Sequence, residues 1–387
     1  MGLEFDILSR ATVVIPLAIL TGVLAACSQP SPSNKVPPKT AVAYQAPPPP
    51  APTTPPPNQV VANDVATNTA QADDPPSPDQ AIDQTIDKAQ APGRPGTAYD
   101  PALVRLEVLL DRAGFSPGVI DGHGGDNLNR ALAAYAQARH LPAGPDTVQA
   151  ALQSLSGQDR APTTQTYQIT AADTAGPFIG TPPKDYPALA RLPALSYSNP
   201  QQLLAETFHM DQHLLKALNP TADFSRPGTR ILVTAPRAPA RRYQAARIEV
   251  DKTNDQVRVF GPDGQLTAAY PATVGSTERP APTGVFAVKG VARNPDYVYD
   301  PRRLTFTPKG ARGKLTIKPG PNNPVGSTWI ALTYPTYGIH GTPDPSLIGK
   351  RASHGCVRLT NWDAAELGRS VKPGVEVDFV GQERRPS

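Results

Sequence analysis

The stretch that decides the fold of the C-terminal part reads Ile-His-Gly-Thr at residues 339–342 and Ser-His-Gly-Cys-Val-Arg-Leu at residues 353–359. A cysteine thiol, with a pKa of ~8.5, is mostly protonated at neutral pH. A nearby imidazole can take its proton and stabilise the thiolate as an ion pair. We therefore expect Cys356 to be a nucleophile and one of the two histidines, His340 or His354, to be its base.

This stretch is open to two other interpretations. A zinc site could combine Cys356 with both histidines, but a fourth ligand at short spacing is missing, and His354 lies unusually close to Cys356 in sequence. A buried structural cysteine is the other alternative, and the two His-Gly motifs in one segment argue against it. We expect neither a metal nor a cofactor.

The residues around this stretch predict a mainly β domain at 243–381. Apolar and polar side chains alternate at 248–250 and 257–259, which is the period of a half-buried strand. One helix is expected to begin at Thr360, within a capping box, and to end before Pro373. Further strands are expected at 285–288, 328–332 and 375–379.

Together these features resemble the L,D-transpeptidase catalytic-domain family of the YkuD type, which implies a β-sandwich. Residues 282–286, residues 320–326 and Trp329 also resemble stretches of that family. The resemblance implies that Cys356 is the nucleophile and that His340 is the general base, oriented by the Gly341 carbonyl. It further implies an oxyanion wall and substrate contacts formed by these residues: Ser353, His354, Gly355 and Arg358. Family members carry either Asn or Arg at the position of Arg358.

The resemblance also implies an activity. Cys356 would attack a peptidoglycan tetrapeptide stem, release the terminal D-Ala and form an acyl-enzyme. An amine of a neighbouring stem would then resolve it into a 3→3 cross-link, and a lipoprotein lysine is an alternative acceptor. Water as the acceptor would make the protein an L,D-carboxypeptidase. From a different class, a non-catalytic peptidoglycan-binding tether stays open as an alternative.

The N-terminal residues predict export and lipidation. Residues 1–26 contain an apolar stretch that is too short to span a membrane and is typical of a signal peptide. Leu-Ala-Ala-Cys at residues 24–27 resembles a bacterial lipobox, which implies lipidation of Cys27 and anchoring to a membrane. We expect a periplasmic protein anchored to the outer membrane, because Ser28 follows the cysteine. Residues 27–96 are rich in Pro and poor in large apolar side chains, which predicts a disordered tether.

Two small modules are expected between the tether and the β domain. At residues 97–160, two helical patterns flank Gly-Phe-Ser-Pro-Gly-Val-Ile-Asp-Gly, an order that resembles a helical peptidoglycan-binding domain. At residues 161–238, the order strand, helix, helix, strand resembles a LysM-like α+β module, which implies glycan binding. A spacer domain is an open alternative for this module. Residues 382–387 are expected to be a tail.

Charge and cysteine content exclude some classes of function. The formal net charge of +4 is mild for 387 residues, so it does not indicate nucleic-acid binding, but it suits a carboxylate-rich partner. The chain has two cysteines, so acylation of Cys27 would leave Cys356 without a disulfide partner in the chain. A run of basic residues between two expected strands can attract stem carboxylates or form a solvated loop: Arg302, Arg303, Lys309, Arg312, Lys314 and Lys318.

Overall fold

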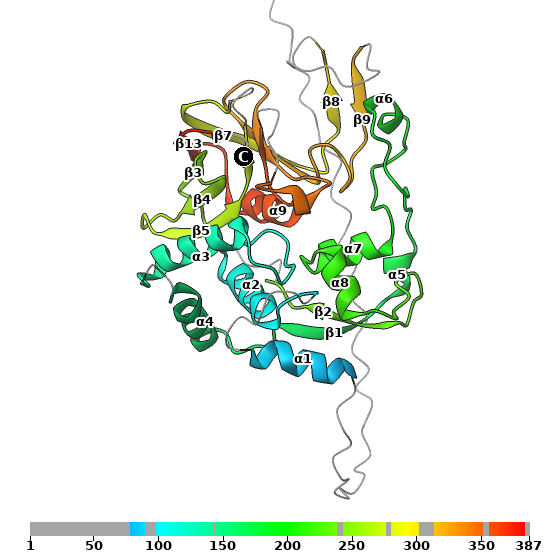
Figure 1. The fold of residues 1–387 in the computed structure, drawn as a ribbon. Helices are drawn as coiled ribbons and strands as arrows, with labels where there is room; N and C mark the ends of the chain where they lie inside the picture. Colours follow the sequence, from blue (N-terminus) through cyan, green and yellow to red (C-terminus); the bar gives the residue numbers. More distant parts are fainter. Residues whose placement is uncertain are drawn as a thin grey trace, which may run out of the picture. The chain divides into compact units, whose positions relative to one another are not determined.

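A computed structural model describes residues 78–89, 98–142, 144, 146–237, 243–275, 280–301, 313–350 and 356–383. All of them belong to one compact unit, Gln71–Ser387 (Figure 1). The expected signal peptide, Cys27 and the tether up to residue 77 lie outside the described residues. So do Ser353, His354 and Gly355.

The segment expected to be a tether contains a helix near its end. Helix α1 (Pro78–Lys88) carries Ile82 and Ile86 four positions apart, and Ile86 is fully buried in a core that α2 shares with the second module. The Asp87 carboxylate accepts a hydrogen bond of 2.7 Å from the backbone N–H of Thr163. The tether prediction is therefore wrong for residues 78–88, because a single pair of isoleucines at helical spacing is enough to dock this turn-rich segment onto a neighbouring core.

The predicted helical module is confirmed in its helices α2 (Pro101–Ala113) and α3 (Asp126–Arg139), which α4 (Thr147–Gln158) follows. Helix α2 begins at the side chain of Asp100, which accepts a hydrogen bond from Ala102 N, and it ends at Gly114, whose φ is +91°. The apolar faces of the helices share one core. Its buried leucines from the three helices are Leu106, Leu109, Leu110, Leu128, Leu132, Leu152 and Leu155.

The second module has the expected order of strand, helices and strand. Strand β1 (Thr164–Gln168) pairs antiparallel with β2 (Arg230–Thr234), and α7 (Pro200–Thr207) and α8 (Gln212–Leu218) lie between them in sequence. The short helices α5 (Ala171–Thr174) and α6 (Tyr186–Leu189) precede α7. We call residues 175–199, which contain α6, the insertion. Identity as a LysM module stays a prediction.

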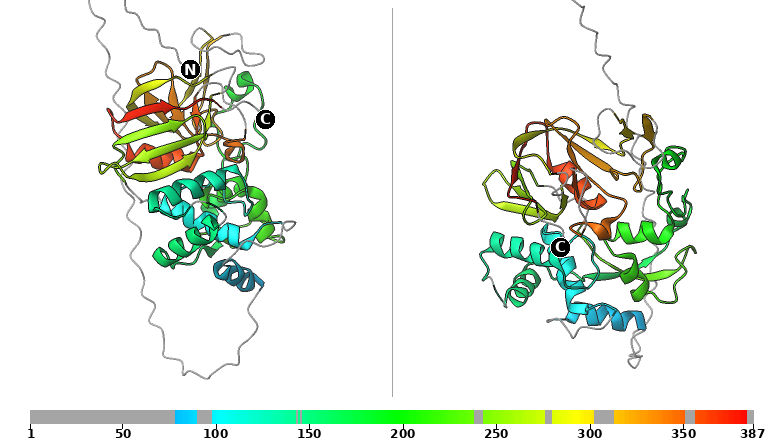
Figure 2. Two further views of the ribbon diagram at one scale, coloured as in Figure 1. Left: turned by 60° about the vertical axis from the view of Figure 1, so that its left-hand side comes forward. Right: turned by 45° about the horizontal axis from the view of Figure 1, so that its top comes forward.

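The C-terminal domain is built on a nine-stranded sheet with the order β5-β4-β3-β13-β7-β10-β11-β12-β6. Figure 2 shows the red strand β13 beside the yellow-green strands of the same sheet. Strands β8 and β9 form a separate antiparallel pair. The bounds are β3 (Arg247–Asp251), β4 (Gln256–Phe260), β5 (Leu266–Pro271), β6 (Thr273–Val274), β7 (Gly284–Arg293), β8 (Tyr297–Tyr299), β9 (Leu315–Ile317), β10 (Thr328–Leu332), β11 (Gly338–His340), β12 (Val357–Arg358) and β13 (Glu376–Val380).

The long strand β7 divides this sheet into two halves. Its first residues, 284–287, pair with β13, whereas its residues from 288 onward pair with β10. Apolar side chains of both halves belong to one core cluster, in which Ile248 and Val257 from one half join Ile339 from the other. Helix α9 (Asn361–Ser370) contributes Ala364 and Leu367 to the same core. The expected β-rich domain with one helix after Thr360 is confirmed.

A buried cation joins the modules to the β-rich domain. The Arg237 guanidinium contacts Asp111 of α2 and, from Nη2, Asp363 of α9 at 2.6 Å. Its Nε contacts Glu366, also on α9. Nearby, the backbone of Ser116 donates a hydrogen bond of 2.9 Å to the Ala269 carbonyl on the edge strand β5. The modules are thus held to the sheet by buried charge pairs and by backbone hydrogen bonds.

Candidate active site

The pairing of β11 with β12 positions the expected catalytic residues. The two strands are parallel, with Ile339 opposite Val357 and His340 opposite Arg358. Because successive side chains alternate between faces, Ile339 and Val357 point into the core, where both are fully buried. His340 and Arg358 share the other face, and Cys356 directly precedes β12 at the position that belongs to this same face. The register of two short strands therefore places the thiol and the imidazole on the same face of the sheet.

The ring of His340 is fixed on two sides. Its Nδ1 lies 2.7 Å from the Gly341 carbonyl oxygen, and since a carbonyl only accepts, Nδ1 carries the proton. Trp329 stands opposite on β10 and stacks on the imidazole, with the ring centroids 5.4 Å apart and the planes at 20°. Nε2 of the neutral ring is therefore left as the acceptor. Gly341 makes the contact that the family resemblance implies for it.

The electrostatics keep His340 in its neutral form. Burial, and then the charge of Arg358, lower the pKa of His340 to about 3, against the opposing hydrogen bond to Gly341. The imidazole is therefore neutral at physiological pH and free to accept a proton at Nε2. A permanently charged imidazole could not act as the base.

The thiol of Cys356 is half-buried and free of any disulfide. Burial raises the pKa of Cys356, and a backbone hydrogen bond from Gly338 and the charge of Arg358 offset this only in part. Gly338 leaves room for the Trp329 ring, because a Cβ there would lie 2.6 Å from that ring. The resting pair is thus a neutral thiol and a neutral imidazole. Burial is the common cause, because it disfavours the charged form of both groups.

Arg358 supplies positive charge at this face. It lies opposite His340 on the paired strand, and its charge lowers the pKa of the His340 imidazole and of the Cys356 thiol. A guanidinium in this place suits the binding of a carboxylate. The expected oxyanion residues Ser353, His354 and Gly355 lie outside the described residues, so their role stays a prediction.

Two tyrosines beside this face were missed by the sequence analysis. Tyr297 of β8 is near enough to the thiol that the charge of Cys356 raises its pKa, after the larger effect of burial. Tyr186 of α6 packs edge-to-face on Tyr297, with centroids 5.7 Å apart. Burial raises the pKa of Tyr186, while a hydrogen bond with Tyr297 and the charge of Arg358 lower it. The insertion therefore contributes a side chain to the surroundings of the nucleophile.

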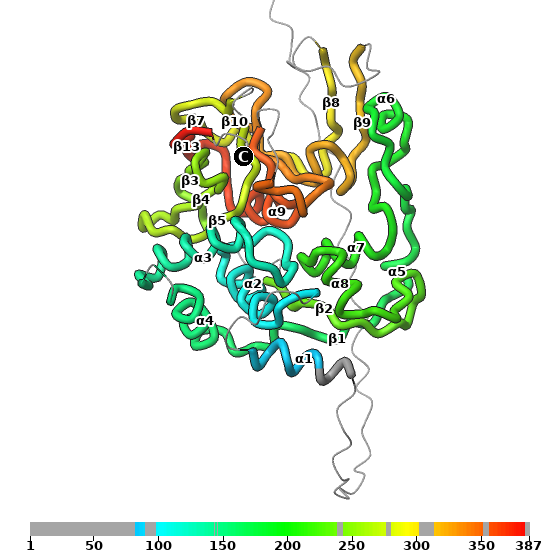
Figure 3. Tube along the Cα trace, in the orientation of Figure 1, coloured from blue at the N-terminus to red at the C-terminus, as the bar shows by residue number. Residues whose placement is uncertain are grey.

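The insertion is held against the β8–β9 pair by both backbone and apolar contacts. Figure 3 traces the chain from α5 up to α6 beside β9 and back to α7. Leu195 donates a backbone hydrogen bond of 2.8 Å to Pro319 and accepts one of 3.0 Å from Asn322. Leu189 and Leu195 share a small core with Ile317 of β9. No sequence signal marks this contact, since the insertion resembles an ordinary Pro-rich loop.

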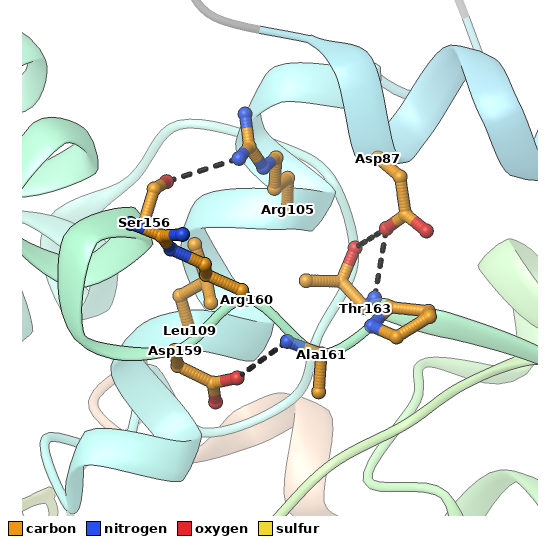
Figure 4. Close-up of a pocket in the computed structure, with 9 residues that line it drawn as sticks. Asp87, Arg105, Leu109, Ser156, Asp159, Arg160, Ala161 and Thr163 are labelled. Carbon is orange, nitrogen blue, oxygen red and sulfur yellow. Dashed lines mark hydrogen bonds between the residues drawn. The ribbon is translucent and has the colours of Figure 1, made fainter.

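A separate cavity of about 300 Å³ lies in the N-terminal modules and contains none of these residues (Figure 4). Two of its charged side chains form hydrogen bonds within the fold. Arg105 donates to the Ser156 hydroxyl at 3.0 Å, and Asp159 accepts from Ala161 N at 2.9 Å. We therefore treat this cavity as a polar junction between α1, α2 and α4.

Two further observations concern metal ions and membranes, and both apply to the part of the chain that the structure describes. There, no group of three or more His, Cys, Asp or Glu side chains is arranged to hold a metal ion. No helix among these residues is long and apolar enough to cross a membrane. Asp121, near the turn after α2, uses its side chain to accept a hydrogen bond of 2.8 Å from His123 N, as a turn residue does.

Comparison with known proteins agrees with this geometry. Residues 245–378 match the model of the YkuD L,D-transpeptidase catalytic domain. A putative L,D-transpeptidase YqjB of Bacillus subtilis is 30% identical over 141 residues, which cover 35% of this chain and 71% of that protein. A putative L,D-transpeptidase YkuD of Bacillus licheniformis is 45% identical over 77 residues, 20% of this chain and 47% of that protein.

The matches are partial in length. The chain spans about half of the Bacillus licheniformis relative, at 47%, and a similar share, 45%, of a putative L,D-transpeptidase YkuD of Bacillus subtilis. Among solved structures, L,D-transpeptidase 3 from Mycobacterium tuberculosis is 18% identical, with a TM-score of 0.29, and covers 35% of this chain and 61% of that chain. The range of the family model lies within the β-rich domain and includes His340 and Cys356.

Proposed function

The chain belongs to the L,D-transpeptidase family, and from this premise we propose that its β-rich domain is an acyltransferase that works on peptidoglycan stem peptides through Cys356. One observation carries the proposal. His340, neutral and fixed through Nδ1 to the Gly341 carbonyl, stands on the same face as the thiol and presents Nε2 as an acceptor.

In the first step, His340 Nε2 takes the thiol proton as the sulfur of Cys356 attacks the carbonyl of the L-centre of the third stem residue. A tetrahedral intermediate forms, and its oxyanion is stabilised by the predicted wall of residues 354–356. The imidazolium then returns its proton to the leaving nitrogen. The terminal D-Ala departs, and a thioester acyl-enzyme remains.

In the second step, an amine attacks the thioester carbonyl and gives its proton to His340. The sulfur leaves and recovers that proton, so the thiol is regenerated and an amide bond is formed. The amine of a neighbouring stem gives a 3→3 cross-link, and a lipoprotein lysine gives an attached lipoprotein. With water as the acceptor, the product is a shortened tripeptide and the enzyme is an L,D-carboxypeptidase.

The N-terminal residues bear on where the protein is located in the cell. We propose that Cys27 is lipidated after removal of residues 1–26 and that the chain is anchored to the outer membrane, with its folded unit in the periplasm. The Leu-Ala-Ala-Cys stretch supports this. The helical module and the LysM-like module are proposed to bind the peptidoglycan peptide or glycan.

Muropeptide analysis tests the reaction. Cells expressing the wild-type chain should accumulate 3→3 dimers, lipoprotein-linked stems or tripeptides, and each product identifies one acceptor. Expression of Cys356→Ala should remove the new product. Identical profiles for the two chains, together with sacculus binding that survives Cys356→Ala, would instead support a non-catalytic tether.

A further inference from the structure

The backbone beside the catalytic base rests on one side chain of α9. Asn361 is buried, with 3% of its surface exposed, and its Oδ1 accepts a hydrogen bond of 3.1 Å from Ser327 N. A Cβ placed on Gly341 would lie 2.2 Å from that same Oδ1. The amide of Asn361 is therefore in direct contact with the backbone of Gly341, the residue whose carbonyl orients His340.

The other end of the Asn361 amide reaches into the second module. Nδ2 donates to both carboxylate oxygens of Glu206 on α7, at 3.0 Å and 3.2 Å. The Tyr197 hydroxyl of the insertion donates to Glu206 Oε1 at 3.2 Å. Asn361 and Tyr197 are neutral donors, so the strength of their hydrogen bonds depends on the charge state of Glu206.

These contacts form a continuous path from the second module to the base. We propose that Glu206 is a positioning residue for the transfer reaction: its carboxylate holds Asn361, Asn361 holds the Gly341 backbone, and the Gly341 carbonyl holds the His340 ring. The inference rests on the proposed function, because it assigns a role in that same site. It gives the second module a part in the chemistry beyond binding the cell wall.

The surroundings of Glu206 should make its hydrogen bond with Asn361 depend on pH. Burial raises the pKa of Glu206 to about 7, although the hydrogen bonds from Asn361 and Tyr197 lower it. Glu206 lines a cavity of about 170 Å³ between the modules and residues 343–346. The other titratable residues that line this cavity are Asp211, His213 and Asp344. Loss of a proton turns Glu206 into a stronger acceptor for Asn361.

The catalytic pair itself should be insensitive to pH over this range. The His340 imidazole, with a pKa of about 3, stays neutral above that pH, and the pKa of the Cys356 thiol is raised. The charge of neither group changes between mildly acidic and mildly basic pH. A step in the acylation rate near neutrality therefore reports on a different group, which the path above identifies as Glu206.

The experiment measures the second-order rate constant for acylation of the full chain, purified in detergent, by a carbapenem between about pH 5 and about pH 9. The wild-type rate should rise roughly tenfold with a midpoint near the pKa of Glu206. Glu206→Gln should abolish the step and leave the low rate at every pH. Glu376→Gln, the same change on an exposed strand residue, should behave as the wild type.

Two further variants keep the test decisive. Tyr197→Phe removes a hydrogen bond that lowers the pKa of Glu206, so the step should move to higher pH. His213→Gln should leave the step in place, and its disappearance in that variant would assign it to His213. A Glu206→Gln chain that retains the wild-type step, at any absolute rate, would overturn the inference. If the wild type itself forms no adduct, the proposed function fails instead.

Discussion

Two carboxylates of the N-terminal modules meet the first turn of α9, and their surroundings differ. Asp111 of α2 shares the Arg237 guanidinium with Asp363. Glu206 of α7 meets Asn361, two positions earlier on the same helix, and accepts hydrogen bonds from the neutral groups of Asn361 and Tyr197. We call these the charged junction and the neutral junction. Among the residues that the structure describes, a compensating cation is found at the charged junction and not at the neutral one.

The pKa values show the consequence of this difference. Burial alone would raise the pKa of Asp111, but the charges of Arg237 and His209 outweigh it and hold that pKa well below its usual range. Burial raises the pKa of Glu206 to about 7 with no such opposition. Asp111 is therefore ionised at all physiological pH values, and the charged junction serves stability. The neutral junction titrates near neutrality, beside the catalytic base.

The largest effect is expected from a substitution that breaks the charged junction. Arg237→Ala would leave the carboxylates of Asp111, Asp363 and Glu366 buried without their cation, so the free energy of unfolding should fall by about 3–5 kcal/mol. Urea denaturation followed by circular dichroism measures this. Arg247→Ala, which breaks a half-exposed pair with Glu249, should cost less than about 1 kcal/mol. Equal losses for the two variants would show that the charged junction does not hold the modules.

A smaller effect is expected from one hydrogen bond at the charged junction. The buried hydroxyl of Ser116 donates to Asp363 Oδ2 at 3.0 Å, so Ser116→Ala should cost about 1.5–3 kcal/mol of stability. Its carbapenem acylation should keep the wild-type pH step, because the change lies on the other junction. Ser225→Ala, at an exposed turn, is the matched control for unfolding. A shift of the pH step in Ser116→Ala would mean that the two junctions are not separate.

The smallest effect is a pH dependence of stability at the neutral junction. The pKa of Glu206 is about 7 in the folded state and about 4.5 in the unfolded state. The protonated form of Glu206 therefore contributes its full stabilisation below about pH 4.5, and this contribution is lost as the pH rises through about 7. Between those limits the wild type should lose on the order of 1 kcal/mol relative to Glu206→Gln, because the side chain is partly exposed. Urea titrations at both pH limits measure the difference. Parallel stability curves would contradict the assigned pKa.

The same comparison explains what the sequence predicts and what it leaves out. Cys356 and His340 could be assigned because their motifs are local and their strands alternate with a simple period. The contact between Glu206 and Asn361 spans 155 positions, and neither residue stands in a motif. Tyr186 reaches the site only because the insertion packs on β9, a contact set by Leu189 and Leu195 rather than by any local pattern. The neutral state of the catalytic pair could not be predicted from the sequence, because the burial that favours neutral groups is a tertiary property.

The most direct test of the central claim is the intact mass of the full chain after incubation with a saturating carbapenem. The wild type should gain the mass of one drug molecule, and peptide mapping should place the adduct on Cys356. Cys356→Ala should keep its unmodified mass. An unmodified wild-type mass, or an adduct that persists in Cys356→Ala, would contradict the assignment of Cys356 as the nucleophile.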